Sequence, residues 1–159
     1  MAGGQHSGMS TNRFNRYFAP AIFGAFDGVV TVLGAVFTLT GDHRALVLSG
    51  VGLAASGAVS MGAGEYLSDS QAGLGVSTVI GATTGLGTLL PVVPYIFNMR
   101  LALLLSITLC LLVAGGISWL KATTDTGTSL LKAGVQTFGV MALATAVILL
   151  CALATGAVG

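Results

Sequence analysis

The chain has 159 residues, of which 54% are hydrophobic and only 7% are charged, far below the roughly 25% of charged residues in soluble domains. This composition excludes a water-soluble globular domain, and the net charge of +1 excludes nucleic acid as a partner, because nucleic-acid binding needs a strongly basic surface. Several apolar stretches instead approach or exceed the roughly 18 to 20 residues that cross a bilayer. We therefore predict an all-α, polytopic membrane protein embedded in the lipid bilayer.

Five transmembrane helices are expected in chain order, after a flexible and cytosolic N-terminal tail at residues 1–15 that has no apolar core of the signal-peptide kind. The polar segments between the helices are short, so neighbouring helices should run antiparallel in one transmembrane domain, residues 16–159. Pro91 and Pro94 near the end of the third helix are consistent with a helix end or kink. The five expected helices cover residues 18–40, 45–67, 74–95, 101–120 and 131–155.

Lys and Arg residues beside the helices predict the orientation, because positively charged loops stay on the cytoplasmic side. A cytosolic N-terminus leaves only Arg44 and Arg100 on the opposite side and places the other four in the cytosol: Arg13, Arg16, Lys121 and Lys132. Short loops and the absence of a targeting segment favour a bacterial cytoplasmic membrane, with a vacuolar membrane as the alternative for a eukaryotic protein.

Small residues recur at every fourth position of the second apolar stretch. Such a column lets another helix backbone approach closely, which is how helices associate in lipid. Gly24 with Gly28 in the first stretch, and Gly81 with Gly85 in the third, repeat this spacing. We predict that these residues pack helices together. The column of the second stretch is Gly52, Ser56, Ser60, Gly64 and Ser68.

Asp27 lies about ten residues into the first apolar stretch and has no basic neighbour on its own helix. A charged side chain near the membrane centre costs roughly 2.5 to 3.5 kcal/mol on insertion scales, so it should face a partner, water or an ion. Its functional interpretation is a metal ligand or proton carrier. The alternative is a structural aspartate that is hydrogen-bonded to another helix.

Met61 and Glu65 lie one helical turn apart in the second stretch, and Gly57 and Asp69 continue the same stripe. A sulfur ligand beside carboxylates favours a first-row transition metal over Mg²⁺ or Ca²⁺, which prefer oxygen ligands. Met61 and Asp27 are at comparable distances from the turn that joins their helices, so we expect similar depths. Two alternatives remain. Met61 can be a packing residue, and Glu65 and Asp69 can be solvated residues at a helix end.

Several strings of the sequence resemble the vacuolar iron transporter family. They are FDGVVTVLGAVFTLTG, VSMGAGEYLSDSQ, LGTLLPVVPYIF and the Gly-rich end of the chain. The resemblance implies a five-helix protomer that forms a homodimer, with an ion path lined by the first two helices at the dimer interface. It also implies export of Fe²⁺, and often Mn²⁺, from the cytosol in exchange for protons. The pathway aspartate, methionine and glutamate of the family fall on Asp27, Met61 and Glu65.

Two features depart from the family pattern. Many members insert a cytosolic, metal-collecting helical domain between the second and third helices, whereas here the third apolar stretch follows Gln71 almost at once. Some members also carry an acidic residue eight positions before the pathway methionine, where this chain has Leu53. The chain therefore resembles the short form of the family, and its metal preference is left open.

The sequence as a whole predicts a metal transporter in which Asp27 or Glu65 couples metal movement to protons. Fe²⁺ or Mn²⁺ is then the transported substrate, and no cofactor is expected to be permanently bound. Two other functions remain open: a proton-coupled exporter of organic cations, for which Phe23, Phe26 and Phe37 lie near Asp27, and a non-transporting helical subunit that assembles other membrane proteins. No activated nucleophile or catalytic dyad points to an enzyme.

Overall fold

The computed structural model describes residues 7–39, 41–68, 73–97, 100–124 and 129–154. Over these residues the structure is helical and contains no strand, which confirms the predicted all-α class. The elements are α1 (Ser7–Thr38), α2 (His43–Ser68), α3 (Gly73–Leu89), the 3₁₀ turn η1 (Leu90–Val92), α4 (Val93–Ile96), α5 (Ala102–Thr124) and α6 (Leu130–Ala154).

Within the described residues, 5 helical segments are long and apolar enough to cross a membrane. Four of them belong to α1, from Arg16 onward, and to α2, α5 and α6, whereas the third, Gly73–Ile96, joins α3, η1 and α4. Pro91 lies in the 3₁₀ turn that interrupts this segment, and Pro94 lies in the first turn of α4, which follows it; a proline nitrogen cannot donate the helical hydrogen bond. The number of predicted membrane helices is therefore confirmed.

The helices α1 and α2 begin two or more residues earlier than the sequence indicated. α1 starts at Ser7, inside the segment predicted as a flexible tail, because hydropathy marks only the part of a helix that lies in hydrocarbon. α2 starts at His43, where the carboxylate of Asp42 accepts hydrogen bonds of 3.0 Å from the backbone N–H groups of Arg44 and Ala45. This is the geometry of a side-chain cap, which satisfies N–H groups that have no partner in the first turn.

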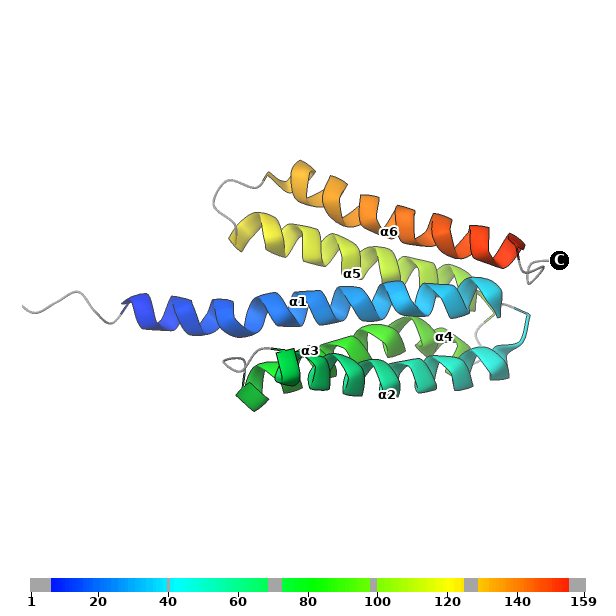
Figure 1. The fold of residues 1–159 in the computed structure, drawn as a ribbon. Helices are drawn as coiled ribbons and strands as arrows, with labels where there is room; N and C mark the ends of the chain where they lie inside the picture. Colours follow the sequence, from blue (N-terminus) through cyan, green and yellow to red (C-terminus); the bar gives the residue numbers. More distant parts are fainter. Residues whose placement is uncertain (1–6, 40, 69–72, 98–99, 125–128, 155–159) are drawn as a thin grey trace, which may run out of the picture.

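The antiparallel helices form two groups that meet at α1, as Figure 1 shows. On one side α3 packs along both α1 and α2, and on the other side α5 and α6 pair with each other and contact α1. A cluster of Val29, Leu33, Cys110, Ala114 and Met141 joins α1 to α5 and α6. A second cluster, which includes Val32, Leu46, Val92 and Tyr95, closes the end of the molecule near the α1–α2 turn.

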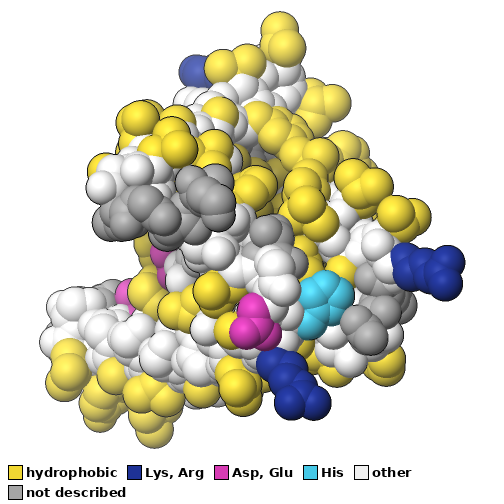
Figure 2. All heavy atoms as spheres, turned by 90° about the vertical axis from the view of Figure 1, so that its right-hand side faces the viewer, with side chains coloured by type: hydrophobic (Ala, Val, Ile, Leu, Met, Phe, Trp, Pro, Cys, Tyr) yellow, Lys and Arg dark blue, Asp and Glu magenta, His cyan; other side chains and the backbone are white. Residues whose placement is uncertain are grey.

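The outer surface is largely apolar, as a bilayer environment requires. Large side chains such as Leu48, Leu112, Trp119 and Leu143 are exposed on the helices. Figure 2 shows the end that carries the α1–α2 turn: hydrophobic side chains cover much of the flanks, while acidic, basic and histidine side chains gather on the end that faces the viewer. The chain is therefore a multi-pass membrane protein.

Ser106 of α5 connects this helix to the break in the third membrane segment. Its fully buried hydroxyl donates a hydrogen bond to the backbone carbonyl of Pro91.

Replacing Ser106 by Ala should lower the free energy of unfolding by about 1 kcal/mol, because this buried bond is lost. Thermal unfolding in detergent measures the change. Thr108→Val on the same helix is the control, since the exposed Thr108 hydroxyl bonds only to Leu104 of its own helix; an equal loss in both variants would contradict the assignment.

Candidate functional site

Asp27 lies on α1 between Gly24 and Gly28, two glycines that bring this helix into contact with α3. A Cβ atom on Gly24 would lie 2.9 Å from the Oγ1 atom of Thr84, and one on Gly28 would lie 2.7 Å from the backbone nitrogen of Thr88. Contacts this close are possible only for glycine. Asp27 lies about 60° around the helix from Gly24 at roughly 100° per residue, so its half-buried side chain is beside the α1–α3 contact.

The α2 helix approaches the same point of α3 from its other side. A Cβ atom on Gly57 would lie 3.3 Å from the Cγ2 atom of Thr84, the residue that Gly24 also meets. Further contacts join Ala58 of α2 to Gly81 and Gly85 of α3. Thr84 is buried and therefore marks the level at which α1 and α2 lie on either side of α3.

This arrangement differs from the one that the short α1–α2 turn indicated. Consecutive helices were expected to be direct neighbours, but α1 and α2 contact each other far less than each contacts α3. Glycine columns explain the difference, since Gly24 and Gly28 favour α3 on the α1 side and Gly81 and Gly85 favour α2 on the other. The α3 helix returns into the space between the first two helices.

Met61 lies on α2 one turn beyond Gly57, toward the end of the molecule at which α1 begins. Gly57 is level with Gly24 and Gly28, between which Asp27 lies. Four residues at a rise of about 1.5 Å each place the Met61 thioether about 6 Å from the level of Asp27 along the helix axis. Glu65 follows one further turn along. Both side chains are half-buried, and the fourth member of the predicted stripe, Asp69, lies outside the described residues. The carboxylate of Asp27 and the thioether of Met61 are thus staggered along the helix axes.

Leu53, one turn before Gly57, is half-buried and contributes no ligand atom. Among the residues that the structure describes, no three His, Cys, Asp or Glu side chains come together as a metal-binding group. Within the described residues, one protomer accordingly presents its candidate ligands singly, at successive levels. Such an arrangement is chemically suited to an ion that exchanges ligands as it moves.

The small-residue column of α2 faces away from the rest of the protomer. Cβ atoms on Gly52 and Gly64 would meet nothing within 4 Å, and Ser56 and Ser60 are exposed. Their hydroxyls donate to carbonyls of their own helix, at 3.3 Å to Leu53 and 3.2 Å to Gly57. Gly24 and Gly28 therefore pack inside the protomer, whereas the α2 column is open to a neighbour.

Thr84 and Thr88 are the residues at this site that the sequence analysis missed. Their buried hydroxyls donate to the carbonyls of Ile80 and Thr84 on their own helix, at 2.8 Å and 2.9 Å. Two threonines one turn apart, in an apolar segment that also carries Gly81 and Gly85, form the signal that could have found them. They supply hydroxyl oxygens on the helix between the two candidate ligand helices.

Comparison with known protein families tests the resemblance. Residues 18–74 match the model of the VIT family. The VIT match covers most of the membrane segment of α1, all of α2 and the start of α3, and it includes the positions of Asp27, Met61 and Glu65. No curated protein and no solved structure matches the chain significantly. The VIT match and the five apolar helices together support a membrane transporter of metal ions, and VIT is a transporter family rather than an enzyme family.

Proposed function

We propose that this protein is a short-form member of the vacuolar iron transporter family that exports Fe²⁺ or Mn²⁺ from the cytosol by proton antiport. The observation that carries the proposal is Asp27, a half-buried carboxylate well inside a membrane helix within the region that matches the VIT family. Ionisable residues at such depth are rare and line substrate or ion pathways. Asp27, Met61 and Glu65 then bind the ion in turn.

The open face of α2 supports a homodimer as the transporting unit. In lipid, helices associate through small residues that permit close backbone approach, and this face presents Gly52, Ser56, Ser60 and Gly64 to the outside. A two-fold axis beside α2 doubles each ligand. It thereby offers a metal ion a second copy of the thioether and carboxylate that α2 carries, Met61 and Glu65.

Proton coupling follows from the chemistry of the carboxylates. A metal ligand must be deprotonated, so metal binding releases protons and becomes weaker as the pH falls. Asp27 and Glu65 can each carry a proton when no metal is bound. Binding metal from the cytosol and protons from the opposite side then gives an exchange of one for the other.

The two rival functions have weaker support. An organic-cation site needs a carboxylate beside an aromatic wall. The cavity lined by Phe18, Phe23 and Phe26 contains Lys121, not Asp27, and a lysine repels cations. A purely structural subunit would explain the open face of α2 but gives Asp27 no role.

Uptake by proteoliposomes tests the proposal and its rivals together. We expect saturable uptake of Fe²⁺ and Mn²⁺, weaker uptake of Co²⁺ and Zn²⁺, and none of Mg²⁺ or Ca²⁺, which prefer oxygen-only ligands. Protein-free liposomes measure the leak. Efflux of a lipophilic cationic dye without metal uptake would support the organic-cation exporter, and a stoichiometric co-purifying partner without any transport would support the assembly subunit.

Substitutions on the open face of α2 should separate dimer formation from folding. Ser56→Leu places a large side chain where a second backbone must approach, so we expect the dimer fraction in lipid to fall by about tenfold, as for loss of a small-residue interface worth about 1.4 kcal/mol. Monomer folding should be unchanged because Ser56 is exposed. Cross-linking or single-molecule photobleaching measures the fraction, with Val147→Leu on exposed α6 as control. Wild-type protein that is monomeric in lipid would contradict this part.

A further inference from the structure

A cavity of about 640 Å³ lies between α1, α5 and α6, on the side of α1 away from α3 and α2. Its floor and walls are mainly apolar and include Phe18, Ile22, Phe26 and Ile117. Two of the lining residues are also exposed at the outer surface: Phe23 is 57% exposed and Val140 is 52% exposed. The cavity therefore opens sideways onto the surface that faces lipid. Its size falls in the range of roughly 300 to 1,000 Å³ of small-molecule sites.

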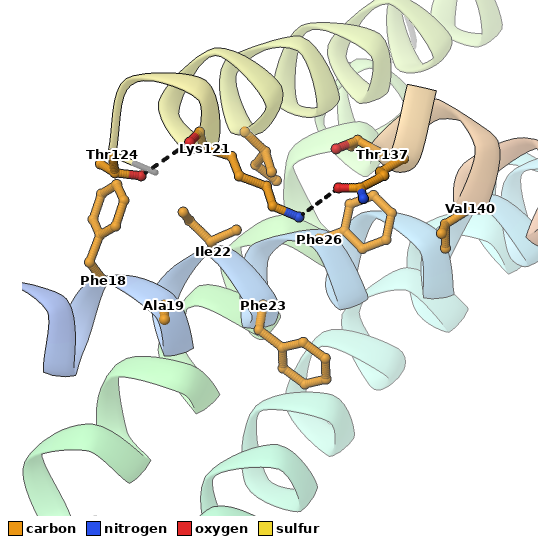
Figure 3. Close-up of a pocket in the computed structure, with 11 residues that line it drawn as sticks. Phe18, Ala19, Ile22, Phe23, Phe26, Lys121, Thr124, Thr137 and Val140 are labelled. Atoms are coloured by element: carbon orange, nitrogen blue, oxygen red, sulfur yellow. Dashed lines mark hydrogen bonds between the residues drawn. The ribbon is translucent and has the colours of Figure 1, made fainter. Parts of the chain in front are cut away.

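One cation is built into this apolar site. Figure 3 shows the Lys121 side chain reaching from α5 across the cavity, where its ammonium donates a hydrogen bond of 3.1 Å to the amide oxygen of Gln136 on α6. Lys121 is half-buried and has no carboxylate partner among the described residues. An ammonium group has three donors, so two remain for a ligand. The cavity therefore combines apolar walls with a positive charge that no carboxylate of the described residues neutralises.

The cavity lies at a membrane boundary. Lys121 is three residues from the end of the segment Ala102–Thr124, and Phe18 is two residues from the start of Arg16–Thr38. Arg16 and Lys132 belong to the same end of the bundle, where α1 enters the membrane segment, α5 ends and α6 begins. A ligand in this place has its charged part at the level of the lipid headgroups and its apolar part in hydrocarbon.

We propose that this cavity binds an anionic phospholipid, with the phosphate at Lys121 and Gln136 and an acyl chain along Phe18, Ile22 and Phe26. Basic pockets between membrane helices at the headgroup level are suited to anionic lipids. The lipid would join α6 to α1, which matters because α6 contacts the rest of the protein mainly through α5. This site is separate from Asp27 and does not depend on the proposed transport function.

Native mass spectrometry of the purified protein, given equal amounts of dioleoylphosphatidylglycerol and dioleoylphosphatidylcholine, tests the site. Wild-type protein should retain the anionic phosphatidylglycerol with about fivefold preference over phosphatidylcholine, the factor expected for one lysine near an anionic headgroup. Lys121→Gln should lose this preference. Lys132→Gln should keep it, because Lys132 is an exposed lysine at the same end that does not line the cavity.

A second pair of variants tests the acyl-chain part without changing charge. Val140→Trp fills the cavity and should reduce the retention of both lipids, whereas Val135→Trp, on the same helix but outside the cavity, should not. These variants keep the test decisive where Lys121→Gln fails to fold. The proposal is overturned by equal retention of the two lipids, by equal losses in Lys121→Gln and Lys132→Gln, or by competition from inorganic phosphate that removes the preference.

Discussion

Asp27→Asn should abolish metal transport while the protein still folds. The substitution keeps the size of the side chain and removes its charge, and with it the ligand that we place deepest in the membrane on α1. Loss of an outer-shell partner of a metal ligand already costs about 10- to 100-fold in affinity or activity, and loss of a ligand itself should cost at least as much. We therefore expect the initial rate of Mn²⁺ uptake into proteoliposomes to fall to the level of the leak. Folding should improve slightly, because an amide is less costly than a carboxylate in hydrocarbon.

Asp42→Asn is the matched control for this prediction. It makes the same replacement of one carboxylate oxygen by an amide nitrogen in an exposed residue that precedes α2, and asparagine caps a helix about as well as aspartate. Its transport rate should equal that of the wild type. Uptake by Asp27→Asn at the wild-type rate would reject Asp27 as part of the path, and an equal loss in both variants would indicate a general effect of surface charge.

Gly28→Ala should separate α1 from α3 and strongly destabilise the protein. The added Cβ atom would lie 2.7 Å from the backbone nitrogen of Thr88 and 3.0 Å from its hydroxyl. Since a backbone atom cannot turn away as a flexible side chain can, the two helices must move apart. We expect a loss of about 3 kcal/mol in the free energy of unfolding, at the upper end of the usual cost of overpacking, measured by thermal or denaturant unfolding in detergent.

Gly34→Ala is the control on the same helix. Its nearest neighbour would be the Cδ1 atom of Ile148 at 3.9 Å, an ordinary van der Waals contact. The change should be neutral or stabilise by up to about 1 kcal/mol, because alanine favours helix over glycine. Unfolding of Gly28→Ala at the wild-type temperature would show that α1 and α3 are not as close as described.

The sequence predicted the number of membrane helices because each has to supply an apolar run of its own. Length and composition are local properties, so they identified all five segments and the proline break in the third at Pro91 and Pro94. The same reasoning failed for the start of α1 at Ser7. Beyond the membrane boundary, polar residues form a helix without any hydropathy signal.

The neighbours of each helix could not be predicted in this way. A short connection makes adjacency of α1 and α2 the simplest expectation, but contact in lipid depends on which faces fit closely. Gly81 and Gly85 were recognised as packing residues, yet only the structure shows that they bring α3 against α2. Asp27 and Met61 remain candidate ligands, now on either side of α3 and about one turn apart in level.

The cavity beside α6 carried no sequence signal either. Lys121 and Gln136 are fifteen residues apart on different helices, and neither belongs to a recognisable motif. Lys121 was read only as a marker of orientation. Its role as the charged group of an apolar cavity depends on the packing of α1, α5 and α6, which no single segment determines.

The most direct test of metal transport is Mn²⁺ accumulation by wild-type proteoliposomes under an imposed pH gradient, with the internal pH recorded by a dye. Exchange of metal for protons predicts that an acidic interior drives uptake above the external concentration and that the internal pH rises as Mn²⁺ enters. Uptake no faster than in protein-free liposomes, at any pH gradient, would contradict the account.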